Sequence, residues 1–374
     1  MMEFHIDQAD FDRALASVAR VIAAQNVMPI LGGIQVTAEG QAVTVMATDL
    51  FVTATATVPA EVTKPGMLVL PAALLADLTH RIPTANLAVV TDAEFKATVR
   101  YGKNRAVLHS FGEATLPEFD AQGAATTTIV LPSGTFGVLA QQVLYACAKD
   151  ETRPILRGIA LMLAEHRLDA IATDGNRLSV VSIPVDAGRQ RAIVMPAKAL
   201  AEAARLNAEA AVTVILGGNF LRIVTETHTL TARLLDGPYP DVARVIPDEY
   251  VTSVIVPREV LRGAVERINL LAALDRSGSL RLQVQPDQLI LSATAAEFGQ
   301  AEETVAATVS GDVLDLAFNP AYLLEAVKSF TGQTIRLAFA GVQAPLQLQD
   351  PDAPGYAHYA LPLRQLSAMQ QVAG

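Results

Sequence analysis

The chain is poor in cysteine and in aromatic residues. Its 374 residues include one cysteine, Cys147, and no tryptophan, and aromatic residues make up 5% of the sequence. One cysteine excludes a disulfide framework within the chain, so we expect Cys147 to be a buried structural thiol in a protein of the reducing cytoplasm. No stretch of about 18 uncharged apolar residues occurs, which argues against a transmembrane helix. The acidic, polar start MMEFHIDQ does not resemble a secretory signal peptide.

Positive charge is also in short supply. The 28 lysine and arginine residues are outnumbered by 38 acidic residues, which gives a formal net charge of −10. This balance argues against a conventional nucleic-acid-binding protein, which usually carries a basic surface. Net charge does not, however, say where the individual charges lie. The hydrophobic content of 51% is enough for large aliphatic cores, and the length predicts two or three domains.

The sequence repeats itself. MPILGGIQV, which starts at Met28, corresponds to RPILRGIAL, which starts at Arg153. The pair Thr48-Asp49 in MATDL corresponds, at the same spacing, to the pair Thr173-Asp174 in ATDGNRLSV. One spacing shared by separate motifs indicates internal duplication. A third and more diverged copy contains SGSLRLQV and ILSATAAEF.

The repeat predicts three domains, at residues 1–122, 123–249 and 250–364, followed by a C-terminal extension at residues 365–374. The breaks fall in segments rich in proline, glycine and aspartate. Each copy reads as a strand, an amphipathic helix, alternating strands, a strand that ends in proline, a second helix and further strands. The expected fold class is therefore α+β, with two helices per domain packed on antiparallel sheets. We expect each proline to occupy the first position of the helix that follows it.

Two acidic residues raise the question of catalysis. Asp49 and Asp174 could be paired carboxylates of a general acid–base site, but they lie in different copies, and the third copy has Ala295 at the nearest corresponding place. The sequence contains no Walker motif, HExxH, GxSxG or Cys/His cluster. We therefore expect no catalysis, no cofactor and no metal site, and interpret the Thr-Asp pair as a turn at a strand end.

The repeated motifs, together with VMPAKAL, LLDGPYPDVARVIP and YALPLR, resemble those of the bacterial sliding clamp family, the beta subunit of DNA polymerase III. The resemblance covers residues 2–364. It implies three DNA-clamp-type domains per chain and a head-to-tail homodimer, a ring around double-stranded DNA that reads no base sequence. It also implies a non-enzymatic processivity role in DNA replication. A clamp-like scaffold that binds proteins without encircling DNA is the alternative.

The resemblance further implies a hydrophobic pocket for short peptides of DNA polymerase and clamp-loader subunits, each with a glutamine and a Leu-Phe-like pair. Aliphatic walls would accept the apolar anchors, and arginine side chains and backbone groups would hold the polar part. The C-terminal stretch QLSAM, with Gln365, Leu366 and Met369, is similar to such peptides, so we hypothesise that the tail competes for a pocket. The pocket positions carried over are Leu156, Thr173, Gly175, Asn176, Arg177, Leu178, Pro240, Arg244, Val245, Pro345, Leu361, Pro362, Leu363 and Arg364.

Two other surfaces follow from the resemblance. Helices that line a DNA channel should carry basic residues on their exposed faces, although interleaved acids predict only a mildly basic channel. Ring closure should join the first domain of one chain to the third domain of the other. The predicted channel residues are Arg13, Arg20, Gln25, Arg81, Lys149, Lys198, Arg205, Arg262 and Lys328, and the predicted seam residues are Lys103, Arg105 and Leu108 facing Leu270, Leu271, Glu302 and Glu303.

Overall fold

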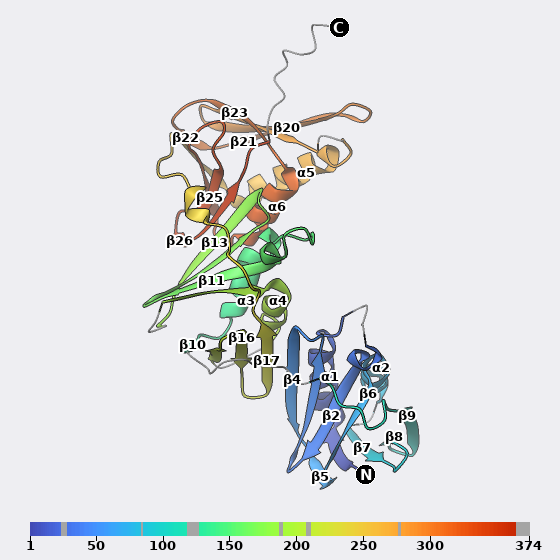
Figure 1. The fold of residues 1–374 in the computed structure, drawn as a ribbon. Coiled ribbons are helices and arrows are strands. Elements are labelled where there is room, and N and C mark those ends of the chain that lie inside the picture. The colour runs from blue at the N-terminus through green and yellow to red at the C-terminus, as the bar shows by residue number, and fades with distance from the viewer. Residues whose placement is uncertain are drawn as a thin grey trace. The chain divides into compact units, whose positions relative to one another are not determined.

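The computed structural model describes residues 1–23, 28–83, 85–117, 127–186, 190–206, 211–275 and 278–363. The chain forms two compact units (Figure 1). Unit 1 comprises Met1–Gly137, Val185–Arg189 and Met195–Leu234, and unit 2 comprises Val138–Pro184, Gln190–Val194 and Leu235–Gly374. The units do not follow the three sequence copies, because the second copy adds strands to a sheet in each unit. The predicted domain boundaries stay predictions, and residues 118–126 around the first of them lie outside the described residues.

Unit 1 contains two antiparallel sheets and the helices α1 (Gln8–Ala19), α2 (Ala72–Arg81) and α4 (Ala197–Ala203). The five-stranded sheet has the order β5-β1-β7-β8-β9, with β5 (Glu61–Lys64), β1 (Glu3–Asp7), β7 (Asn86–Thr91), β8 (Lys96–Tyr101) and β9 (Asn104–His109). The eight-stranded sheet has the order β10-β15-β16-β17-β4-β3-β2-β6, with β10 (Thr127–Leu131), β15 (Val212–Leu216), β16 (Phe220–Val224), β17 (His228–Arg233), β4 (Val52–Pro59), β3 (Ala42–Thr48), β2 (Gly33–Glu39) and β6 (Gly66–Pro71).

Unit 2 has the same plan, with helices α5 (Arg258–Ala272) and α6 (Pro320–Ser329). Helix α3 (Thr135–Val143) begins in unit 1 and ends in unit 2. The nine-stranded sheet has the order β14-β11-β12-β13-β26-β25-β24-β18-β22, with β14 (Arg191–Pro196), β11 (Gly158–Ala164), β12 (Arg167–Thr173), β13 (Arg177–Pro184), β26 (Ala353–Ala360), β25 (Leu346–Asp350), β24 (Thr334–Phe339), β18 (Thr252–Pro257) and β22 (Thr308–Ser310). The four-stranded sheet has the order β21-β20-β19-β23, with β21 (Gly299–Ala306), β20 (Gln288–Ala295), β19 (Leu280–Gln285) and β23 (Leu314–Phe318).

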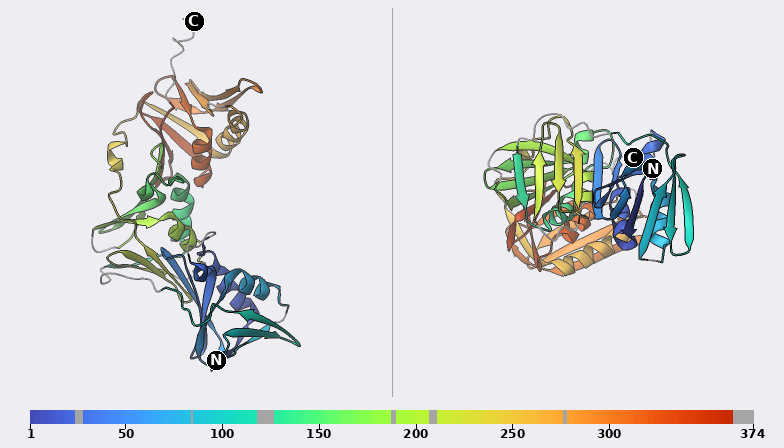
Figure 2. Two further views of the ribbon diagram at one scale, coloured as in Figure 1. Left: turned by 45° about the vertical axis from the view of Figure 1, so that its right-hand side comes forward. Right: turned by 90° about the horizontal axis from the view of Figure 1, so that it is seen from below.

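The helices lie against the sheets (Figure 2). Helix α1 buries Phe11, Leu15 and Val18, which recur at helical spacing, and packs against α2, β3 and β4. Helix α5 likewise packs against α6, β20 and β21. The expected α+β plan with paired helices on antiparallel sheets is confirmed. No described helix is long and apolar enough to span a membrane.

The prolines that precede the second helices differ from the expectation in detail. Pro320 is the first residue of α6, and the side chain of Asn319 caps this helix by accepting a hydrogen bond from the Ala321 amide. Pro71 and Pro196 instead occupy the cap position, one residue before α2 and α4 begin. Both placements cost no hydrogen bond, because the amides at the start of a helix have no intrahelical acceptor.

In each unit, a strand of one sequence copy pairs with a strand of the next copy. In unit 1, β4 of the first copy pairs with β17 of the second, with Val52 opposite Ala232. In unit 2, β13 of the second copy pairs with β26 of the third, with Arg177 opposite Ala360. Both pairs are antiparallel, and β4 and β13 are the repeat equivalents of each other. The chain therefore uses one mode of strand addition twice.

Candidate binding pocket and charged surfaces

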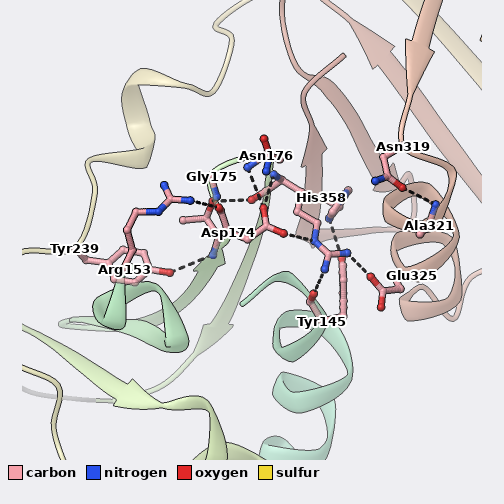
Figure 3. Close-up of polar contacts among 12 residues, drawn as sticks. Tyr145, Arg153, Asp174, Gly175, Asn176, Tyr239, Asn319, Ala321, Glu325 and His358 are labelled. Carbon is pink, nitrogen blue, oxygen red and sulfur yellow. Dashed lines mark hydrogen bonds and ion pairs between the residues drawn. The ribbon is translucent and has the colours of Figure 1, made fainter. Parts of the chain in front are cut away.

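The Thr-Asp pair at the end of β12 builds a tight corner. The carboxylate of Asp174 accepts hydrogen bonds from the amides of Asn176 (2.9 Å) and Arg177 (3.1 Å). The hydroxyl of Thr173 donates to the Arg177 carbonyl (2.6 Å) and accepts from the Gly175 amide (3.0 Å). The carboxylate is therefore occupied in fixing the turn (Figure 3).

The first copy repeats this corner bond for bond. Asp49 accepts from the amides of Phe51 (3.0 Å) and Val52 (2.7 Å). Thr48 donates to the Val52 carbonyl (3.2 Å) and accepts from the Leu50 amide (3.1 Å). Asp49 belongs to unit 1 and Asp174 to unit 2. The two acids thus share a turn-forming role, as the sequence indicated.

Beside the corner of the second copy lies a hollow of about 200 Å³. Five segments form it: the 3₁₀ turn Pro154–Arg157, the corner itself, the 3₁₀ turn Val242–Arg244 with its flanks, the loop before β25, and the end of β26 with the residue after it. Its lining is mainly apolar, with polar groups at the rim. The lining residues are Arg153, Leu156, Thr173, Gly175, Asn176, Arg177, Leu178, Pro240, Asp241, Val242, Val245, Pro345, Tyr359 and Leu361.

Most of the predicted pocket residues come together in this hollow. Pro362 and Leu363 line a neighbouring hollow of about 690 Å³, which shares Leu361 with the first. Arg244 is not part of the lining; its guanidinium pairs with the lining residue Asp241, and its side chain is 84% exposed. Arg364 and the tail at residues 365–374 lie outside the described residues. The residues placed in the first hollow as predicted are Leu156, Thr173, Gly175, Asn176, Arg177, Leu178, Pro240, Val245, Pro345 and Leu361.

Sequence reasoning missed four lining residues: Arg153, Asp241, Val242 and Tyr359. Asp241 and Val242 lie one and two residues after the predicted Pro240, so the segment was predicted but these two of its lining residues were not. Tyr359 lies two residues before the predicted Leu361, on β26. Arg153 directly precedes the repeated Pro-Ile-Leu motif, and only a fold can place it over the corner.

Arg153 forms one rim of the hollow. Its guanidinium donates to the Asp174 carbonyl (2.7 Å) and lies over Gly175. A Cβ at Gly175 would be 2.8 Å from Nη1 of Arg153, and φ at this residue is +94°. Leu50 occupies the equivalent position in the first copy with φ 76°, so the turn itself tolerates a side chain. The Arg153 contact is what distinguishes Gly175.

Two protonated groups lie behind the floor of the hollow. The Tyr239 hydroxyl accepts from the Thr173 amide (3.1 Å) and donates to the Gly158 carbonyl (3.4 Å), and burial raises the pKa of this tyrosine. Cys147 also contacts the Gly158 carbonyl, and burial raises the pKa of its thiol to about 12. Cys147 is thus the buried structural thiol that the sequence led us to expect.

The guanidinium of Arg177 is bound inside the protein, on the far side of the corner. Its side chain is 3% exposed and pairs with Asp174 and Glu325, and it also donates to the Tyr145 carbonyl. In Figure 3, Arg153 and Tyr239 lie on one side of Asp174, and Tyr145 and Glu325 on the other. Arg177 therefore has little capacity to bind a ligand directly, in contrast to the polar-anchor role that we expected.

Most predicted channel cations already pair with acids of the same unit. Glu202 binds both Arg20 (3.1 Å) and Arg205 (2.7 Å). Gln25 lies outside the described residues. Among the described residues, Arg81 and Lys149 form no ion pair. The remaining cations pair as follows: Arg13 with Asp10, Lys198 with Asp49, Arg262 with Glu259 and Glu266, and Lys328 with Glu266.

The predicted seam residues differ in exposure. Leu270 is 73% exposed at the end of α5, whereas Leu108 on β9 is 3% exposed and belongs to the core. Side chains alternate along a strand, so Val107, which is 49% exposed, is the apolar side chain that β9 presents to solvent. Glu303 pairs with Arg267 of its own chain (2.6 Å), on the helix-facing side of β21.

The described residues contain no group of three or more His, Cys, Asp or Glu side chains that could hold a metal ion. The repeated α+β fold, with its equivalent turn-forming corners and an apolar hollow that has polar groups at its rim, is that of a clamp-type protein. Sequence models of the DNA polymerase III beta subunit match its N-terminal domain at residues 2–120, its central domain at 130–241 and its C-terminal domain at 243–364. The chain belongs to the DNA polymerase III beta-subunit family, the bacterial sliding clamps.

Individual members of this family are similar to the chain over nearly its full length. The beta sliding clamp of Pseudomonas putida is 28% identical over 368 residues, which cover 97% of this chain and 100% of the relative. The solved DNA polymerase sliding clamp of Bacillus subtilis is 25% identical, with a TM-score of 0.90 over 97% of this chain and 99% of that chain. A C. crescentus beta sliding clamp, solved with polyethylene glycol bound, is 28% identical, with a TM-score of 0.91 and the same coverage.

Proposed function

We propose that two copies of this chain close head to tail into a ring around double-stranded DNA in the cytoplasm. The ring gives processivity in DNA replication without catalysis and docks DNA polymerase and clamp-loader subunits. Membership of the sliding-clamp family supports the replication role. The pairing of strands across the copies is the observation that carries the closed ring.

The pairing leaves one complementary edge at each end of the repeat series. β4 and β13 each pair with the last strand of the next copy, β17 and β26. The third copy has the equivalent strand β21 at a sheet edge, and the first copy has its last strand β9 at a sheet edge. An unpaired edge is a template for another strand. A second copy, placed head to tail, supplies β9 for β21 and closes the ring at two identical seams.

The observed registers predict the register of the seam. In β13–β26, Val180 lies opposite Ala357. By the repeat, Val180 corresponds to Glu302 on β21, and Ala357 corresponds to Arg105 on β9. Opposite charges at directly facing positions of an antiparallel pair stabilise it. The same register puts the exposed Val107 opposite Gln300 of the second copy.

Charge reversal tests this seam. Arg105→Glu should shift the solution mass from two chains toward one, measured by light scattering at micromolar concentration, because it places two acids opposite each other. Arg105→Glu combined with Glu302→Arg should restore the dimer. A single-chain mass for the unaltered protein would overturn the ring, and a failure of the double variant would overturn the register.

DNA encirclement is tested separately, because a scaffold that binds proteins alone could also dimerise. After loading, the protein should stay on nicked circular DNA and leave when the same DNA is linearised. Equal retention on both forms would favour a clamp-like scaffold without encirclement. Most predicted channel cations are paired within the chain, so we expect contacts with DNA phosphates to be weak and non-specific.

The hollow beside the Asp174 corner is the proposed peptide site. Its apolar lining and polar rim suit a peptide with a glutamine and a Leu-Phe-like pair. Leu361 and Val245 line it and are 38% and 45% exposed, so Leu361→Ser and Val245→Ser should weaken peptide binding without disrupting the core. Met67→Ser, at an exposed position on β6 in unit 1, is the matched control. Unchanged affinity for both pocket variants would exclude the hollow.

A further inference from the structure

The corner that shapes the pocket floor carries an addition that its counterpart lacks. Val52 occupies the position in the first copy that Arg177 occupies in the second. The corner hydrogen bonds of Thr48 and Asp49 are nonetheless the same as those of Thr173 and Asp174. The turn therefore does not need an arginine at this position, and the contacts of Arg177 require another explanation.

The two corners also obtain their positive charge from different places. The second carboxylate oxygen of Asp49 binds Lys198, which lies near the start of α4. The second carboxylate oxygen of Asp174 binds Nε of Arg177 (3.0 Å), from within the same loop. By the repeat, the position of Lys198 corresponds to Tyr322 on α6. The guanidinium of Arg177 lies over the Tyr322 ring, 4.3 Å from its centroid.

In the first copy, helix α4 thus supplies a lysine to the corner, whereas in the second copy the corner supplies an arginine that contacts helix α6. One terminal nitrogen of Arg177 donates to Glu325 on α6, and the other donates to the Tyr145 carbonyl. With Asp174, these contacts hold the guanidinium between two carboxylates and an aromatic face, in an almost fully buried place. A buried cation is stable only where such partners surround it, so its position is strongly specified.

The backbone of Arg177 takes part in the pocket wall. Its carbonyl accepts from Thr173, and its neighbours Asn176 and Leu178 both line the hollow. The Asn176 carbonyl accepts from the Leu361 amide (2.9 Å), which links the corner to the opposite wall. Fixing the side chain of Arg177 on α6 thus fixes the segment that carries the floor and one wall.

We propose that Glu325 is a positioning residue for the peptide pocket, acting through Arg177. It lies in α6, does not line the hollow, and is 39% exposed. It anchors the guanidinium away from the hollow, so that the segment from Gly175 to Leu178 keeps the shape that a peptide requires. This inference rests on the proposed peptide-docking function of the hollow.

The test measures binding of a fluorescein-labelled peptide, with a glutamine and a C-terminal Leu-Phe pair, by fluorescence anisotropy. Glu325→Ala should weaken binding roughly three- to tenfold; a tenfold loss of affinity corresponds to about 1.4 kcal/mol of binding free energy. Glu325→Gln keeps an acceptor for Arg177 and should recover most of the affinity. Glu259→Gln, which removes an exposed carboxylate that also pairs with an arginine, is the matched control and should have no effect.

Hydrogen exchange separates positioning from general stability. The amides of Asn176 and Arg177 are bound to Asp174 and should exchange faster in Glu325→Ala, while the equivalent amides of Phe51 and Val52 should not change. Peptide affinity that stays unchanged in Glu325→Ala, even with a lowered melting temperature, would overturn the proposal. Leu361→Ser and Val245→Ser separate the two levels. If both leave peptide binding intact, the proposed peptide-docking function fails; if they weaken binding and Glu325→Ala does not, only the role of Glu325 fails.

Discussion

Gly175→Ala separates two constraints on the pocket corner. Gly175 has φ +94°, and a Cβ there would be 2.8 Å from Nη1 of Arg153. The left-handed backbone region costs a residue with a Cβ about 1–2 kcal/mol. The clash involves the end of a flexible side chain, so Arg153 can move away. That movement loses its hydrogen bond to the Asp174 carbonyl, a net loss of about 0.5–1.5 kcal/mol.

The expected total for Gly175→Ala is therefore a loss of about 1.5–3.5 kcal/mol of unfolding free energy, of which the backbone share is the larger. Urea unfolding monitored by fluorescence or circular dichroism measures it. In an Arg153→Ala background, the same substitution should cost only the backbone share of about 1–2 kcal/mol. The difference between the two backgrounds is the energy of the Arg153 contact.

Leu50→Gly is the matched control, because Leu50 occupies the equivalent position with φ 76° and the repeat position of Arg153 is Met28 in the first copy. Relief of backbone strain and the extra entropy of the unfolded chain oppose each other there, so stability should change by less than about 1 kcal/mol. A Gly175→Ala variant as stable as the unaltered protein would refute the strain argument. An equal loss with and without Arg153 would refute the contact argument.

Three further results are expected. Burial, and then the charge of Arg177, lower the pKa of His358 to about 3, so below pH 6.5 the unfolded chain binds a proton that the folded chain does not. This residue should therefore lower the unfolding free energy by at most about 1.4 kcal/mol per pH unit as the pH drops from 6.5 toward 3. In His358→Phe, the urea midpoint should depend less on pH between about pH 6.5 and 5. Lys198→Met breaks a partly exposed ion pair with Asp49, so it should lower the unfolding free energy by about 1 kcal/mol. It should reduce the dependence of DNA affinity on salt concentration less than Lys149→Ala, because Lys149 forms no ion pair among the described residues. An equal reduction would show that the paired lysine still contacts phosphates. Deleting residues 365–374 should tighten peptide binding through loss of a competing tail, and an unchanged anisotropy titration would refute that competition.

The repeat made most of the fold predictable. Amphipathic spacing located helices such as α1 and α5, because buried faces dominate helix formation in a folded domain. The turn role of Asp174 was predictable from its sister Asp49, since a residue that recurs in both corners serves the shared backbone. The compact units were not predictable, because strand pairing across copies depends on which edges meet in space and leaves no local pattern.

The pocket was predictable as a set of segments, and less so as a set of side chains. Leu361 and Pro345 line the hollow because their segments converge on the corner. Arg244, which was predicted to line the pocket, is exposed and pairs with Asp241, whereas Arg153, which was not predicted, lies at the rim and donates to the Asp174 carbonyl. Sequence spacing fixes where the backbone runs, but the direction of a long side chain in a loop depends on partners brought by other segments.

The charged surfaces explain how an acidic chain is compatible with the proposed DNA-encircling ring. A cation on a helix face attracts phosphate only to the extent that no nearer acid neutralises it. Glu202 binds two of the predicted channel arginines, and Glu266 binds one arginine and one lysine. A paired lysine or arginine can still contact a DNA phosphate, but such contacts release few counterions. They therefore slow movement along DNA only weakly. In the proposed ring, the seam between β9 and β21 has to supply the retention that attraction does not. Breaking the proposed facing pair of Arg105 and Glu302 should therefore release the protein from circular DNA as effectively as cutting the DNA itself.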